Sequence, residues 1–123
     1  MWKPATDMAT DAARRAPARP AAAALFAALG DPTRLALVDV LADGSRRSIA
    51  QLSGNATVTR QAITKHLRVL EAARLVRSER AGREARYALD PERLAEARTY
   101  IDAVAARWDE ALGRLKAFAE KTP

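Results

Sequence analysis

The sequence predicts a mainly α-helical domain with one small β-hairpin, and three observations lead to this fold class. Apolar residues recur at helical spacing over most of the chain, whereas only residues 75–89 show the alternation and turn residues of paired strands. The 123 residues suffice for one domain with one core, and 49% of them are apolar. Aromatic residues make up only 5%, so aliphatic side chains must build that core.

The N-terminal segment is the least structured part of the prediction. Residues 1–20 hold three of the six prolines together with small and charged residues, so we expect a disordered tail. An arginine pair precedes an alanine-rich stretch, as in some export signals, but Pro17 and Pro20 interrupt the apolar run. No apolar run reaches the roughly 18 residues of a membrane span. We therefore expect the protein to remain in the cytoplasm.

Two short helices are expected at the start of a domain that we place at 21–121. Residues 21–29 form an apolar helix, and Gly30 ends it as a C-cap. Asp31 then serves as the N-cap of a second helix, with Pro32 at the first helical position. The apolar residues of this second helix follow a period of 3.6: Leu35, Leu37, Val38 and Leu41.

A short third helix and a longer fourth helix follow, separated by a turn. Ser48 can cap the third helix, at about 49–53, and a Gly-Asn pair after it is a turn signal. Either Thr57 or Thr59 can cap the fourth helix, which runs to about residue 73. A short helix, a tight turn and a second helix at this spacing are typical of a helix-turn-helix motif.

Two strands and a long last helix complete the predicted elements. Residues 75–80 and 85–89 are the strands, and a short glycine-containing turn joins them. Asp90 and Pro91 repeat the cap-and-proline start, and the last helix continues to about residue 120. A two-stranded ribbon directly after a helix-turn-helix is the layout of a winged helix.

Positive charge is concentrated in the middle of the sequence. The chain carries 21 lysines and arginines against 15 aspartates and glutamates, a net charge of +6. Residues 46–86 alone hold ten basic and three acidic residues, so more than the whole excess lies there. The electrostatic contact with any polyanionic partner is therefore expected in this segment.

The predicted fourth helix has a polar, basic face opposite an aliphatic one. Ile63, Leu67 and Leu70 form the aliphatic face, which can pack on the two preceding helices. An ordinary amphipathic surface helix would show a similar pattern. Over residues 59–70, however, the polar face lacks acidic residues, and the helix precedes a basic hairpin. We therefore expect this face to enter a DNA groove, where Arg can read guanine and Gln adenine. Its members are Arg60, Gln61, Thr64, Lys65 and Arg68.

Further DNA contacts are expected on either side of this helix. Arg80 and Arg83 lie near the tip of the hairpin and can reach a neighbouring minor groove. Phosphate contacts are expected through a hydroxyl, an amide and a helix N-terminus, from Ser48, Gln51 and Thr59.

Two long segments resemble a known family, the ArsR/SmtB-type winged-helix repressors. The opening of the family's first two helices, which often reads ALGDPTRL, is matched by ALFAALGDPTRLALVDVLADG. Its recognition helix and wing are similar to RQAITKHLRVLEAARLVRSERAGREARYAL. The resemblance covers about residues 22–120. It implies a homodimer, joined through its first and last helices, that represses transcription and releases its operator on an effector signal.

The sequence lacks the residues with which the best-known members of that family bind metals. Cysteine is absent, and His66 is the only histidine. The last helix offers scattered carboxylates, which suit hard ions rather than the thiophilic or borderline ions that such repressors sense. We therefore expect no metal site and no cofactor. His66 is expected to pack within the motif or to face a DNA phosphate, rather than to act as a pH sensor or ligand.

The last predicted helix carries an apolar stripe at heptad spacing, over more than three heptads: Leu94, Ala97, Ile101, Val104, Trp108, Ala111, Leu115 and Phe118. Such a stripe can pack within its own domain or against a partner. A chain this small has little core left to cover so long a helix, which favours the partner. We expect a dimer interface made of Leu25, Phe26, Leu29, Ile101, Val104, Trp108, Leu112 and Leu115.

Together these observations predict a homodimeric transcriptional repressor. It would bind an inverted-repeat operator through the helix at about 59–73 and the wing at about 75–89. The alternative is a winged-helix protein-interaction module that does not bind DNA, and salt-dependent duplex binding separates the two. An enzyme is disfavoured, since the sequence shows no nucleophile paired with a base and no glycine-rich phosphate loop. The operator, the regulated genes and the inducing signal cannot be derived from the sequence.

Overall fold

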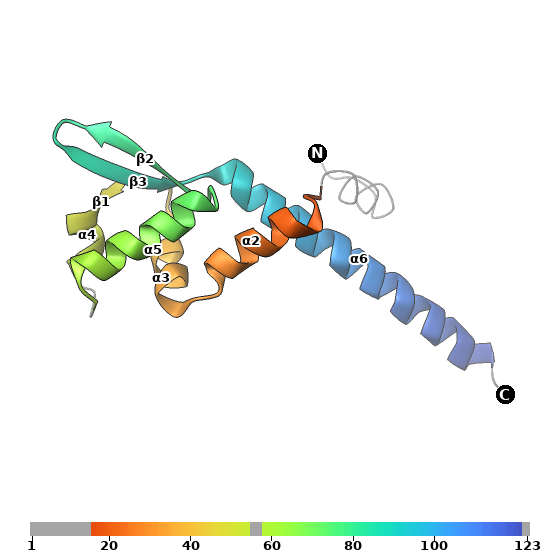
Figure 1. Ribbon diagram of the computed structural model, residues 1–123. Coiled ribbons are helices and arrows are strands. Elements are labelled where there is room, and N and C mark those ends of the chain that lie inside the picture. The colour runs from red at the N-terminus through yellow and green to blue at the C-terminus, as the bar shows by residue number, and fades with distance from the viewer. Residues whose placement is uncertain (1–15, 55–57, 122–123) are drawn as a thin grey trace.

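The computed structural model describes residues 16–54 and 58–121 (Figure 1). Most of the predicted tail, and Thr57, lie outside the described residues. The predicted mainly helical fold with a small antiparallel sheet is confirmed. Its elements in chain order are α2 (Arg19–Leu29), α3 (Pro32–Leu41), β1 (Arg47–Ser48), α4 (Ile49–Ser53), α5 (Arg60–Ala72), β2 (Val76–Ala81), β3 (Glu84–Leu89) and α6 (Pro91–Lys121).

Three of the expected helix starts are present as capped N-termini. The carboxylate of Asp31 accepts hydrogen bonds from Thr33 N and Arg34 N, at 2.9 and 3.1 Å. Thr59 caps α5, its hydroxyl oxygen accepting from Ala62 N at 3.1 Å. Asp90 accepts likewise from the first backbone N–H groups of α6. Each cap satisfies backbone donors that have no partner inside the helix.

The N-terminal boundary and the sheet differ from the prediction. Helix α2 begins at Arg19, two residues early, because Pro20 fits the first turn, where its missing N–H costs no hydrogen bond. Strand β1 was not predicted. It pairs antiparallel with β3 and gives a three-stranded sheet in the order β1-β3-β2.

The β2–β3 hairpin turns through two residues. Ala81 pairs with Glu84, so Gly82 and Arg83 form the turn. Gly82 has a φ of +66°, a conformation that a glycine adopts without steric cost and that suits the twist of a hairpin. The hairpin projects from the body at the end opposite the free half of α6 (Figure 1).

The core lies between α2, α3, α5 and the base of the sheet. Its largest fully buried side chains are Leu25, Leu41, Ile63, Leu67, Leu70, Leu75 and Val76. Helix α5 ends in a Schellman motif, with Leu75 N bonded to Leu70 O and Arg74 N to Glu71 O, both at 2.9 Å. Arg74 has a φ of +61°, the left-handed conformation in which this motif usually places glycine.

Arg93 joins three helices from a buried position. Its side chain, in the first turn of α6, is only 8% exposed. Its Nε donates to Ala73 O after α5 at 2.8 Å, and one Nη donates to Ala21 O in α2 at 3.4 Å. The other Nη pairs with Glu96. The charge is thus both paired and hydrogen-bonded, as a buried guanidinium requires.

Helix α6 extends well beyond the other elements (Figure 1). Leu94 and Ala97 in its first turns pack against the core, and Tyr100 meets Phe26 of α2 with ring centroids 5.8 Å apart. Within the described residues no single helix is long and apolar enough to cross a membrane. Helices α2 and α3 reach that composition only when taken together, across a bend of 91°.

Candidate DNA interface

The helix-turn-helix begins with a capping box around α4. Ser48 Oγ accepts from Gln51 N at 3.2 Å, and Gln51 Oε1 accepts from Ser48 N at 2.9 Å. The spacing Ser-x-x-Gln in the sequence is the signal for this reciprocal cap, and only the serine half of it was predicted. Ser48 is only 5% exposed. Its hydroxyl is therefore not at the surface, contrary to the expectation that it contacts a DNA phosphate. Gln51 is exposed and keeps its amide N–H₂ for a partner.

Helix α5 separates its two faces as predicted. Ile63, Leu67 and Leu70 are at most 1% exposed and belong to the core. Thr64 is half-buried, and its hydroxyl donates to Arg60 O at 2.8 Å. The remaining members of the predicted groove-facing set are exposed: Arg60, Gln61, Lys65 and Arg68.

The N-terminus of α5 carries a cation where isolated helices favour an anion. Arg60 is the first helical residue, and the first turn contains no acidic residue. The partial positive charge of a helix N-terminus repels this guanidinium and attracts an anion instead. With Thr59 exposed beside it, this end of α5 is suited to a phosphate.

The β2–β3 hairpin carries Arg80 on the face toward α5, and Arg77 and Arg86 on the opposite face. Cross-strand partners share a face of a sheet, and Arg80 lies on the same face as buried Val76. Ser78, also on that face, donates to Glu71 of α5 at 2.7 Å and so ties the wing to the helix. Arg83 is exposed in the turn, and its carbonyl accepts from Arg80 at 3.4 Å.

The opposite face of the hairpin is partly neutralised. Glu79 pairs there with Arg46, from the loop before β1, at 2.5 Å. The register places Arg86 directly across from Glu79. On the α5 side and at the tip, Arg80 and Arg83 form no ion pair within the described residues.

His66 lies apart from the groove-facing set. Its Nδ1 is 3.2 Å from Arg34 Nη1 and 3.8 Å from Asp31, the N-cap of α3. This agrees with the expectation of packing within the motif. Arg34 also donates to Ala28 O at 2.6 Å. The sequence analysis missed this residue, because its hydrogen-bond partners lie on other helices.

The residues expected at a dimer interface divide into three groups. Leu25 is fully buried in the chain's own core, which removes it from any surface. Phe26 and Leu29 are half-buried and pack against that core. The members on α6 are exposed, with Trp108 64% accessible: Ile101, Val104, Trp108, Leu112 and Leu115.

Among the described residues there is no group of three or more histidine, aspartate or glutamate side chains placed to hold a metal ion. The expectation that the protein binds no metal stays a prediction.

Two sequence comparisons agree with this geometry. A family model described as a helix-turn-helix domain matches residues 29–79. The HTH-type transcriptional regulator Rv2034 of Mycobacterium tuberculosis is 44% identical over 75 residues, 61% of this chain and 69% of that protein. The HTH-type transcriptional repressor SmtB of the same species is 37% identical over 92 residues, 75% of this chain and 66% of its own length.

The fold is also found among solved structures. An ArsR-like transcriptional regulator from Rhodococcus sp. RHA1 has a TM-score of 0.74 and 36% identity, covering 84% of this chain and 96% of its own. This chain therefore belongs to the ArsR/SmtB-type family of winged-helix, DNA-binding transcriptional regulators.

Proposed function

We propose that this protein is a homodimeric repressor that binds an inverted-repeat operator in the cytoplasm. Helix α5 of each copy enters a major groove, and the β2–β3 wing reaches the adjacent backbone or minor groove. The observation that carries this proposal is the division of α5 into a fully buried aliphatic face and an exposed face that carries only cationic and uncharged side chains from Arg60 to Arg68. The carboxylate of the helix, Glu71, lies in its last turn and accepts a hydrogen bond from Ser78 of the wing. A protein-docking helix does not need so uniform a charge, whereas a phosphate lattice selects for it.

Direct readout is assigned to the exposed residues of α5. Gln61 can form paired hydrogen bonds with adenine, and Arg60 or Arg68 with guanine. Thr59, Gln51 and the wing arginines Arg80 and Arg83 contact phosphates or the minor groove, which orients α5 without selecting bases. Ser48 and His66 support the motif from within.

A second copy of the chain is the proposed occupant of the α6 stripe. Large apolar side chains, among them Ile101, Val104, Trp108, Leu112 and Leu115, lie exposed along one face of α6 beyond its contact with α2. An apolar surface of this length is typical of an association site. A two-fold dimer presents two α5 helices to half-sites about one DNA turn apart, which is why we expect an inverted repeat.

The test is selection from a random duplex pool, followed by measurement of affinity against salt. With about six phosphate contacts, affinity should fall roughly 10³-fold between 50 and 200 mM salt. Duplex binding that is absent, or that does not change with salt, would favour the protein-interaction alternative.

A charge-reversal pair provides the matched control. Arg60→Glu should abolish duplex binding while leaving the fold intact, because a carboxylate suits the N-terminus of α5. Arg114→Glu changes the net charge equally on the distant part of α6, and should bind the duplex nearly as well as the unmodified protein. Equal losses in the two variants would contradict a specific role for α5.

A further inference from the structure

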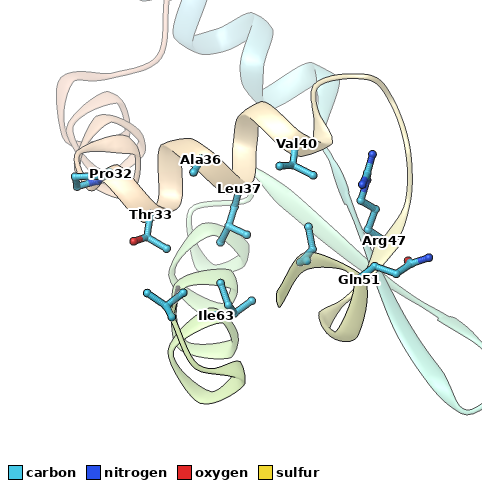
Figure 2. Close-up of a pocket in the computed structure, with 10 residues that line it drawn as sticks. Pro32, Thr33, Ala36, Leu37, Val40, Arg47, Gln51 and Ile63 are labelled. Carbon is cyan, nitrogen blue, oxygen red and sulfur yellow. The ribbon is translucent and has the colours of Figure 1, made fainter. Parts of the chain in front are cut away.

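A cavity of about 480 Å³ lies between α3 and the helix-turn-helix (Figure 2). Ala36 and Val40 of α3 line one wall, and Leu52 of α4 and Ile63 of α5 line the other. The volume falls within the roughly 300–1,000 Å³ of small-molecule sites, which are mostly apolar with a few polar groups that orient the ligand. This cavity has that composition.

Arg47 and Gln51 lie together at one end of the cavity, and Thr33, its other polar lining residue, lies at the opposite end (Figure 2). Arg47 Nε donates to Ser45 Oγ at 2.9 Å, and Nη2 donates to Asp43 at 3.2 Å. Its Nη1 makes no hydrogen bond within the described part of the chain. The hydrogen bonds from Ser45, and then Arg47, hold the pKa of Asp43 below its usual value, so the carboxylate stays ionised and fixes the guanidinium.

Gln51 adds a second donor at the same end. Its Oε1 is engaged by Ser48 N in the capping box, which holds the side chain in place and leaves the amide N–H₂ available. Two donors at one end, and a lining that is apolar elsewhere except for Thr33, call for a ligand with an acceptor head and a hydrocarbon body.

We propose that this cavity binds a small monocarboxylate with an apolar body, either a medium alkyl chain or an aromatic ring. The carboxylate meets Arg47 Nη1 and the Gln51 amide, and the body lies between α3 and the two helices of the motif.

The position of the cavity gives binding a regulatory consequence, and this part rests on the proposed function. One wall belongs to α3, and the other belongs to the two helices that contact DNA. A ligand between them changes their separation, and it also occupies Gln51, a proposed phosphate contact. The carboxylate should therefore weaken duplex binding, and duplex should weaken carboxylate binding by the same factor.

The experiment is calorimetric titration of the full chain with octanoate, and with 1-octanol as the uncharged comparison. Octanoate should bind saturably. Ala36→Phe fills the cavity from an exposed position of α3 and should lower octanoate affinity at least about tenfold. Ala42→Phe adds the same ring just beyond α3, outside the cavity, and should leave the affinity unchanged.

A third variant tests the polar end. Arg47→Met should weaken octanoate about fivefold, the effect of one lost hydrogen bond, and leave 1-octanol unchanged. No saturable binding, or equal affinity in Ala36→Phe and Ala42→Phe, would overturn the proposal. Equal losses of octanoate and 1-octanol in Arg47→Met would overturn the assignment of the head group.

The regulatory part has its own readout. Octanoate should weaken the affinity of the unmodified protein for its selected duplex, and should leave the Ala36→Phe variant unaffected. Duplex affinity that does not respond to bound octanoate would overturn the regulatory role. A chain that binds octanoate as described, but binds no duplex, would contradict the proposed function and still support the cavity site.

Discussion

Arg34 on α3 donates a hydrogen bond from Nη1 to Nδ1 of His66 on α5, over 3.2 Å. A guanidinium has only donors, so Nδ1 is the acceptor in this contact. The same guanidinium donates to Ala28 O and Ala27 O at the end of α2, where carbonyls lack partners within the helix. One side chain thus connects three helices of the DNA-binding body.

Replacing this arginine should cost measurable stability. Arg34→Met keeps the length of the side chain but leaves the carbonyl of Ala28 and Nδ1 of His66 without their donor. We expect the free energy of unfolding in urea to fall by about 2 kcal/mol. Arg46→Met, which removes an exposed ion pair with Glu79, is the control and should cost less than about 1 kcal/mol. Equal losses would show that the Arg34 contacts contribute no more than a surface pair.

Asp31 should make stability depend on acid. The hydrogen bond from Arg34 N, above all, holds the pKa of its carboxyl below the ordinary value of 3.8. The unfolded chain therefore takes up this proton first, so the stabilisation is complete above about pH 4 and is lost as pH falls through the lower folded pKa. Asp31→Asn retains an N-cap without a titration. Its unfolding free energy should fall less steeply below pH 4 than that of the unmodified protein, and parallel curves would contradict this assignment.

Arg74 offers a stabilising substitution. Its φ of +61° is strained for a residue with a Cβ and free of strain for glycine. Arg74→Gly should raise the free energy of unfolding by about 0.5–1 kcal/mol, after the greater freedom of the unfolded glycine is included. Arg77→Gly, in strand β2, should instead lower it by about 1 kcal/mol. Thermal unfolding of both variants measures the difference in sign.

Base readout and backbone contact should separate in two alanine variants. Gln61→Ala should relax discrimination at one base position, by about 1–3 kcal/mol. Arg83→Ala should weaken binding to all duplexes more evenly, because a wing contact to backbone or minor groove depends little on sequence. Affinities over a library of single-base operator variants give both profiles, and identical profiles would refute this division of roles.

Trp108 should affect association more than folding. It is 64% exposed in the single chain, so its truncation removes little from the core of that chain. If a partner covers it, Trp108→Ala should weaken the dimer by about 3–5 kcal/mol and reduce operator affinity with it. Glu110→Ala, on the opposite side of α6, is the control. Sedimentation should show a monomer with native helix content for the first variant and a dimer for the second.

The helices were predictable because the residues that cap a helix, and those that form its apolar face, lie close together in the sequence. Asp31 with Pro32, and the 3.6-residue period of α5, required nothing beyond the local sequence. Strand β1 could not be predicted in this way. Its two residues show no alternation, and they become a strand only through pairing with Tyr87 and Arg86.

The candidate site follows the same distinction. The exposed face of α5 was predicted except for Thr64, which is half-buried, because the positions of side chains around a helix follow from their spacing alone. Spacing along the helix could not decide whether Leu25 belongs to the core or to a dimer interface, because that depends on which other elements pack beside it. The roles of Arg34 and Arg93 were missed because their acceptors include backbone carbonyls of other helices, and any residue type supplies such a carbonyl.

The buried guanidinium of Arg93 has a consequence for the geometry of the operator. It holds the end of α5 against α6, so two copies joined through α6 would present their recognition helices at a fixed separation and rotation. Each base pair added between half-sites turns one of them by about 35° around the duplex axis. A dimer held in this way cannot follow that rotation by reorienting its two α5 helices. The length of the spacer would then discriminate among genomic sites as strictly as the bases themselves.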